Sequence, residues 1–118
     1  YNNNLSSLPA DISDRYPELE LLDCGNNQLI AIPDMMNFAY LHILNIDNNK
    51  IHVLPNTINC PNIKHFSCKS NKIANLSKTI LNWKKLKFID LTGNIGIRQN
   101  ISPDIAAYII QHNIEYKF

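Results

Sequence analysis

Three side chains of the kinds that form a hydrolytic triad occur in the second half of the chain: His65, Ser67 and Asp90. In such a triad a hydroxyl attacks the substrate, an imidazole takes its proton, and a carboxylate orients the imidazole. The reaction also needs free backbone N–H groups for the oxyanion and a pocket that excludes water. A hydroxyl on a regular strand, where we expect Ser67, has neither. We therefore expect no enzymatic activity, and keep a hydrolase that uses these three residues as an alternative.

The three cysteines could bind a metal or form a disulfide, but their positions favour neither. Cys60 and Cys68 flank His65, yet Cys68 is expected to point into the core and His65 out of it, so we predict no zinc site. Cys24 and Cys68 are expected on strands about 10 Å apart, which is too far for a disulfide. We expect inert, buried thiols, with exposure of Cys60 as the alternative. An odd number of cysteines fits a reducing, intracellular compartment.

A repeat of 22 or 23 residues positions these side chains. Its pattern is Leu-x-x-Leu-x-Leu-x-x-Asn-x-Leu, in which isoleucine, phenylalanine or cysteine replaces some of the leucines. The four units place their pattern residues at Leu19, Leu22, Cys24, Asn27 and Leu29; at Leu41, Leu44, Ile46, Asn49 and Ile51; at Ile63, Phe66, Cys68, Asn71 and Ile73; and at Leu86, Ile89, Leu91 and Asn94. A unit of this length cannot bury its own apolar side, so it must stack on its neighbours.

The pattern resembles the leucine-rich repeat (LRR) family, from residue 3 to about residue 97. This resemblance implies an α/β solenoid: a segment of a horseshoe with a short parallel β-sheet on its concave face and 3₁₀ or α turns on its convex face. We divide the single domain 1–118 into a partial repeat 1–18, repeats 19–40, 41–62, 63–85 and 86–101, and a C-terminal cap 102–118. The Leu-Pro-x-x-Ile style of the segments that return from each strand resembles leucine-rich-repeat effectors of intracellular bacterial pathogens.

We expect short parallel strands centred on residues 21–24, 43–46, 65–68 and 88–91. An Asn amide offers both donors and an acceptor to the backbone groups of the tight corner that follows each strand. We therefore predict a stacked, structural ladder of Asn27, Asn49, Asn71 and Asn94. Pro9, Pro33 and Pro55 should each begin a short helical turn on the convex face.

The end of a solenoid exposes its core and requires a cover. Residues 103–112 are predicted to form a helix that covers the last repeat, because Ser102 is suited to its N-cap and Pro103 to its first position. Its apolar stripe should face the core. The N-terminus has only half a unit, so a cap there is expected to be either lost or very small.

Residues that alternate with core positions must face out of the sheet. The central outward column contains Leu21, Ile43, His65 and Phe88, and a row of apolar residues bordered by charges is the usual composition of an interaction site. We predict that the concave face binds a partner protein. The predicted binding residues are Glu20, Leu21, Asp23, His42, Ile43, Asn45, Asp47, Lys64, His65, Ser67, Lys69, Lys87, Phe88 and Asp90.

Composition narrows the function further. A net charge of +1 gives no general attraction to nucleic acid, and no apolar run is long enough to span a membrane. We expect no cofactor, no metal and no small-molecule substrate. The predicted function is that of a protein-protein interaction module, which regulates or inhibits an enzyme partner by covering its functional surface. If the protein is a bacterial virulence effector, we expect it to be delivered into the host cytoplasm. The alternative is the recognition part of a larger protein, such as a ubiquitin ligase effector.

Overall fold

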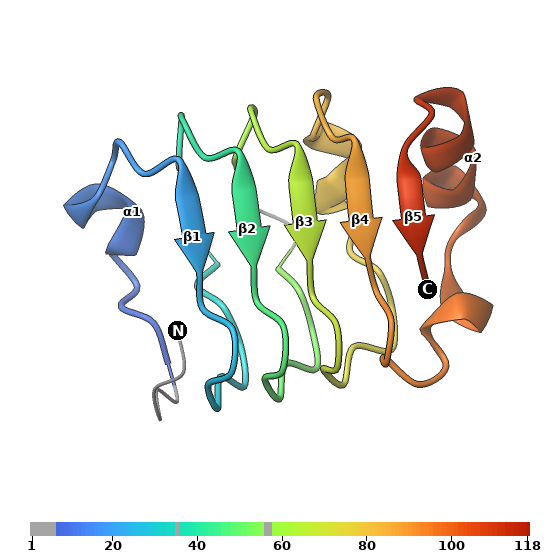
Figure 1. Cartoon of the computed structure of the whole chain (residues 1–118), viewed down its shortest axis with the longest axis horizontal. Helices are drawn as coiled ribbons and strands as arrows, with labels where there is room; N and C mark the ends of the chain where they lie inside the picture. The colour runs from blue at the N-terminus through green and yellow to red at the C-terminus, as the bar shows by residue number, and fades with distance from the viewer. Residues whose placement is uncertain (1–6, 35, 56–57) are drawn as a thin grey trace.

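The computed structural model describes residues 7–34, 36–55 and 58–118. It contains a five-stranded parallel sheet in the order β1-β2-β3-β4-β5 (Figure 1). The strands are β1 (Leu21–Asp23), β2 (Ile43–Asn45), β3 (His65–Ser67), β4 (Phe88–Asp90) and β5 (Glu115–Lys117). The helical elements are α1 (Ile12–Arg15), the 3₁₀ helices η1 (Lys78–Asn82) and η2 (Ile97–Asn100), and α2 (Pro103–Gln111).

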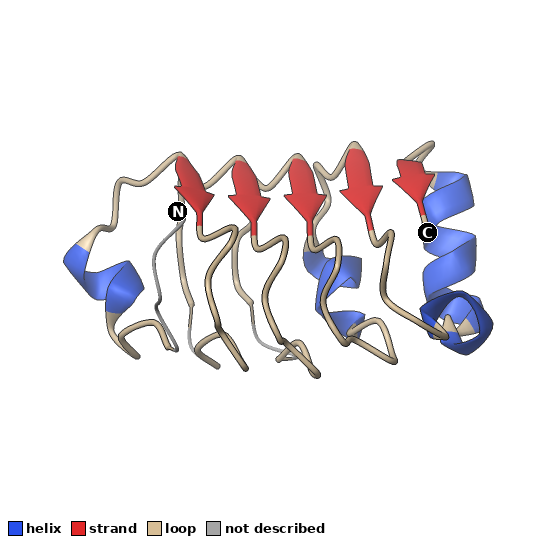
Figure 2. Cartoon of the chain, turned by 60° about the horizontal axis from the view of Figure 1, so that its bottom comes forward, coloured by secondary structure: helices blue, strands red, loops and turns tan. Residues whose placement is uncertain are grey.

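The sheet forms one side of a solenoid, and the returning segments with their helices form the other (Figure 2). The first four strands lie where the repeat predicted them. Their register is the register of the repeat, because Leu21 pairs with Ile43, Ile43 with His65, and His65 with Phe88. The parallel sheet and the solenoid architecture are therefore confirmed.

A single apolar core runs between the two sides. Its strand layer contains Leu44, Phe66 and Ile89, all fully buried. Trp83, from the returning segment of the third repeat, packs edge-on against Phe66 with ring centroids 5.1 Å apart. The Trp83 indole N–H donates to the Ile58 carbonyl at 3.0 Å, so this large side chain is buried without losing its hydrogen bond. Trp83 therefore ties the third repeat to the second.

Asn49 illustrates the ladder. Its side-chain NH₂ donates to the carbonyls of Ile46 in its own repeat and of Cys24 in the preceding one, both at 3.0 Å. Its Oδ1 accepts the backbone N–H of Leu29 at 3.0 Å. One amide thus satisfies backbone groups in two successive turns of the solenoid.

Asn71 and Asn94 repeat this arrangement one and two units later. Their Oδ1 atoms accept the backbone N–H groups of Ile51 and Ile73, and their NH₂ groups reach back to the carbonyls of Ile46 and Cys68. Asn27 is also buried and donates to the Cys24 carbonyl. Each of the four asparagines is therefore placed, and bonded, as a structural residue.

The residue before each ladder asparagine has a positive φ. These residues are Asn26, Asn48, Ser70 and Gly93, with φ of 57°, 55°, 54° and 83°. The left-handed region is open to glycine and tolerated by asparagine, while serine adopts it at a steric cost. At Gly93 a Cβ would also lie 3.0 Å from the Ser70 hydroxyl oxygen. The corner therefore constrains the residue type at two adjacent positions of each repeat, the one with positive φ and the ladder asparagine.

The returning segments were predicted to contain short helical turns. Helical turns occur after Pro9, as α1, and in the third unit, as η1. The described residues of the segments with Pro33 and Pro55 contain none; Met35, Asn56 and Thr57 lie outside the description. Ser77 stands where those two repeats have proline, and its hydroxyl accepts the Thr79 N–H at the start of η1. The turns predicted to begin at Pro33 and Pro55 would include Met35, Asn56 and Thr57, so for these two segments the turns stay a prediction.

The C-terminal helix begins as predicted. The Ser102 hydroxyl accepts the Ile105 N–H, Pro103 lies in the first turn, and Ile105 and Ile109 face the core. The helix ends at Gln111, one residue earlier than expected. The Tyr108 hydroxyl donates to the Trp83 carbonyl at 3.0 Å and fixes α2 against the returning segment of the third repeat.

Strand β5 was not predicted. After α2 the chain turns through Asn113, which has a φ of 52°, and Glu115–Lys117 pairs in parallel with β4. The stretch 102–118, expected to be a helical cap, therefore also contains a fifth strand, which covers the edge of β4. Ile114, immediately before this strand, is buried.

The ladder can be tested with a substitution at its centre. Asn49→Ala should lower the free energy of unfolding by about 1–3 kcal/mol, because the buried Leu29 N–H loses its partner and the Cys24 and Ile46 carbonyls each lose one of their donors. Asn48→Gly is the matched control, since it removes the neighbouring exposed amide but keeps the left-handed corner. Chemical denaturation measures both. Equal stabilities would contradict the assigned role of Asn49.

Docking of α2 can be tested through one hydroxyl. Tyr108→Phe should lower the free energy of unfolding by about 0.5–1.5 kcal/mol, the usual net contribution of one hydrogen bond. Tyr40→Phe removes the same atom from an exposed side chain and should change stability by less than about 0.5 kcal/mol. If the two variants had the same thermal midpoint, the Tyr108–Trp83 bond would not hold the helix.

Candidate functional site

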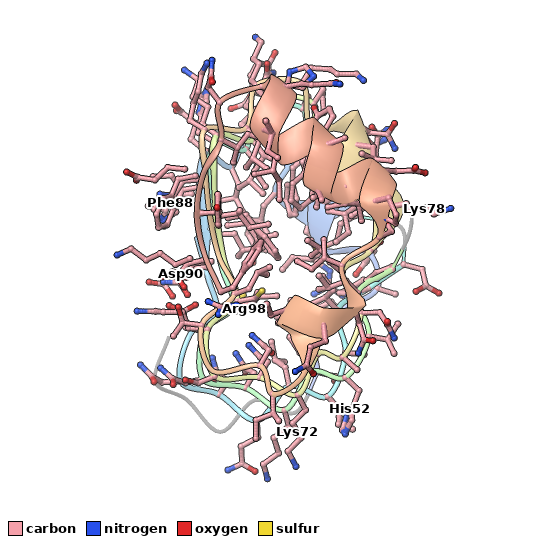
Figure 3. The ribbon with its side chains drawn as sticks, turned by 90° about the vertical axis from the view of Figure 1, so that its right-hand side faces the viewer. His52, Lys72, Lys78, Phe88, Asp90 and Arg98 are labelled. Carbon is pink, nitrogen blue, oxygen red and sulfur yellow. The ribbon has the colours of Figure 1, made fainter. Side chains whose placement is uncertain are left out.

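The face of the sheet that points away from the core, called here the outer face, contains the predicted binding residues. Figure 3, viewed along the solenoid, shows Phe88 and Asp90 on this face and Lys78 on the opposite side. The repeat arranges the outer face in rows that cross the strands. The side chains of these rows differ in exposure and in bonding.

The central row contains Leu21, Ile43, His65 and Phe88, and Glu115 of β5 extends it. Leu21 is 53% exposed and Ile43 38%, so two aliphatic side chains lie in contact with solvent. His65 and Phe88 are half-buried and stack, with ring centroids 4.5 Å apart and ring planes at 28°. The row thus changes from aliphatic on β1 and β2 to aromatic on β3 and β4.

The next row contains Asp23, Asn45, Ser67 and Asp90, and three of these side chains have a structural role. The Oδ1 atoms of Asp23, Asn45 and Asp90 accept the backbone N–H two residues later, at 2.9, 2.9 and 3.0 Å. Such short-range bonds close the turn that leaves a strand. Sequence reasoning assigned these residues to partner binding and missed this role, although an Asp or Asn at the end of three of the four predicted strands was a visible signal.

Ser67 of β3 and Asp47, which follows β2, form a buried pair between two repeats. The Ser67 hydroxyl donates to Asp47 Oδ1 at 2.6 Å, and the Lys69 N–H donates to the same oxygen at 2.7 Å. Ser67 is only 4% exposed, Asp47 8% and Asp90 6%. These three predicted binding residues therefore offer little surface to a partner.

The suggested hydrolytic triad is not assembled. The Ser67 hydroxyl donates to Asp47 and not to His65. His65 stacks on Phe88, and Asp90 accepts both the N–H and the hydroxyl of Thr92. Each member is engaged with a different partner, so the arrangement lacks the hydrogen bond between base and nucleophile that the mechanism requires.

The charged residues border the central row on both sides. Glu20, His42, Lys64 and Lys87 form the flank that precedes the strands, and His42 Nδ1 lies 3.8 Å from Glu20 Oε1. On the other side, Lys69 Nζ lies 3.9 Å from Asp47 Oδ2. Lys117 was not among the predicted residues, yet its Nζ lies 5.9 Å from the centre of the Phe88 ring. It was missed because β5 was missed.

All three cysteines are buried and free. Burial raises the pKa of the Cys24 thiol to about 11, and it raises the pKa of Cys60 and, more strongly, of Cys68. The alternative of an exposed Cys60 is thus wrong. Within the described residues no three His, Cys, Asp or Glu side chains gather in a way that could hold a metal ion.

No helix in the described part of the chain is long and apolar enough to cross a membrane. No protein-family model and no curated protein matches the sequence. Among solved structures, a leucine-rich-repeat protein of Leptospira interrogans is similar over the whole of this chain, with a TM-score of 0.79 and 24% identity. This chain spans 30% of the length of that protein. The likeness supports the LRR-type fold that the repeat predicted.

The state of the thiols gives a direct test of the core. In the folded protein all three should react slowly with Ellman's reagent at pH 8, because they are buried and their raised pKa values keep them protonated. Unfolding in guanidinium chloride should make three thiols react rapidly. Immediate reaction of one thiol in the native protein would show that a cysteine lies at the surface.

Proposed function

We propose that the chain is a protein-binding module whose outer face holds a partner protein. The observation that carries this proposal is the central row: Leu21 and Ile43 are exposed although the core does not need them, and they continue into the half-buried His65–Phe88 pair. Scattered apolar residues are normal on a surface, but a contiguous row with charged borders has the composition of an interface.

The construction of the face suits this role. The outer side chains stand on short strands whose register is fixed by the ladder, so they form a preorganised surface and lose little entropy on binding. The turn-closing bonds of Asp23, Asn45 and Asp90 hold the ends of these strands. A face five strands wide can bury on the order of 800 Å² on this side, the usual size for a specific complex.

A role within this class can also be proposed. On the described outer face Ser67 bonds to Asp47 and His65 stacks on Phe88, so the exposed surface consists of the central row and its charged borders. We therefore propose action by covering a functional surface of the partner, for example the active site of an enzyme. Recognition on behalf of a catalytic domain, as in a ubiquitin ligase effector, is the second candidate, and delivery into a host cell stays a prediction.

Energy at an interface concentrates in a few central, well-packed side chains. Phe88→Ala and Ile43→Glu should each weaken binding of a partner captured with the wild-type protein by more than about 2 kcal/mol. Isothermal titration calorimetry measures the affinity, and a thermal midpoint within a few degrees of wild type should accompany each loss.

The matched controls lie on the returning segment of the third repeat. Lys78→Ala and Asn82→Ala alter exposed residues of η1, on the side of the solenoid away from the sheet. Both should leave the affinity unchanged. If the η1 variants lost binding while Phe88→Ala and Ile43→Glu kept it, the outer face would not be the binding site.

A further inference from the structure

Charge is unevenly distributed over the outer face. Over β1 and β2 the carboxylates at the surface are those of Glu20 and Asp23, since Asp47, which follows β2, is buried and bonded to Ser67. Over β3 to β5 the exposed charged side chains are Lys64, Lys69, Lys87 and Lys117, opposed by Glu115. Asp90 also lies there, but it is buried and accepts two hydrogen bonds from Thr92. The outer face therefore has an acidic end and a basic end, although the chain as a whole carries a charge of +1.

The basic end surrounds the aromatic pair. Lys64 and Lys87 directly precede β3 and β4, and the Lys87 N–H donates to the Lys64 carbonyl at 2.8 Å, so the two residues lie side by side. Lys117 approaches the Phe88 ring from β5. Within the described part of the chain, none of these three lysines has an ion-pair partner. Three unpaired ammonium groups thus border one apolar platform.

From this arrangement we propose that the outer face binds an extended acidic segment of a partner protein. An apolar side chain of the segment lies on the His65–Phe88 pair, and its carboxylates lie beside Lys64, Lys87 and Lys117. This inference rests on the proposed function and names its partner class. Five strands about 4.8 Å apart span about 19 Å, which about six residues of extended chain can cross. The remainder of the segment, over β1 and β2, is apolar or basic, because it meets Leu21 and Ile43 beside Glu20 and Asp23.

The chemistry of the cations decides between classes of partner. Lysine is a flexible point charge without a fixed fork of donors, so it selects a charge pattern and not one sequence. A nucleic acid carries uniform negative charge and would place phosphates against Glu20 and Asp23, whereas a peptide can vary its charge along its length. Exposed charges also make association sensitive to salt.

Four fluorescent peptides of seven residues provide the probes. One has a Leu-Ser-Phe centre with two aspartates at one end and two lysines at the other; the second has the reverse order, because the binding direction is open. The third peptide carries aspartates at both ends, and the fourth carries lysines at both ends. Two double variants of the protein are compared. The first combines Lys87→Glu with Lys117→Glu, and the control combines Lys72→Glu with Lys78→Glu. The control has the same net charge, and its two positions lie away from the outer face (Figure 3).

Fluorescence anisotropy and ¹H–¹⁵N NMR shifts give the readout. One of the two peptides with aspartates at one end and lysines at the other should bind and shift the His65 and Phe88 amide signals. Its affinity should fall about tenfold or more for the Lys87 and Lys117 variant, and less than about twofold for the control variant. The variant should in turn prefer the peptide with lysine at both ends. This exchange of preference would show that charge, and not general damage, determines binding.

The contrary outcomes separate the two proposals. If the lysine peptide bound the wild-type outer face as well as the acidic peptides did, the acidic partner would be wrong while the outer face remained the site. Tighter binding of a single-stranded oligonucleotide at His65 and Phe88 would also overturn the acidic peptide. Shifts confined to η1 and the other returning segments would contradict both proposals. Both would also be contradicted if no peptide shifted the amides of the outer face and the Phe88→Ala variant still bound a captured partner with wild-type affinity.

Discussion

The side-chain amide of the ladder asparagine is the interaction on which the solenoid depends. At each corner the chain leaves the sheet, and its backbone groups lose the partners that a strand would give them. Asn49, Asn71 and Asn94 each supply donors to two successive repeats and an acceptor to the preceding one. Because a buried, unpaired backbone group costs about 1–3 kcal/mol, the sequence keeps asparagine at this position while it varies the apolar residues around it.

The corner also determines what the outer face can be. Since every repeat turns in the same way, equivalent residues pair across neighbouring strands and the outward side chains form continuous rows. One row is committed to closing the turns, through Asp23, Asn45 and Asp90. The central row has no such task, and in it two aliphatic side chains are exposed beside the half-buried aromatic pair. Function is therefore expected where the repeat leaves the residue type free.

Periodic features were predictable, and departures from the period were not. The four strands and the ladder follow from a spacing of 22 or 23 residues, and Ser102 with Pro103 marked the start of α2. Strand β5 was missed because Phe88 and Glu115 are 27 residues apart, with a nine-residue helix between them, so the pattern shifts out of phase. The burial of Asp47 and Ser67 was hidden because their bond joins the corner of one repeat to the strand of the next. Such pairs between repeats become visible only when side-chain geometry is known.

Hydrogen exchange at three amides tests the ladder most directly. The N–H groups of Leu29, Ile51 and Ile73 donate to the side-chain oxygens of Asn49, Asn71 and Asn94, not to another backbone group. Measured by NMR in the native protein, these amides should exchange as slowly as the Ile46 N–H, which donates to a backbone carbonyl of the next strand. Exchange of the three at the rate of exposed amides, with Ile46 protected, would contradict the account.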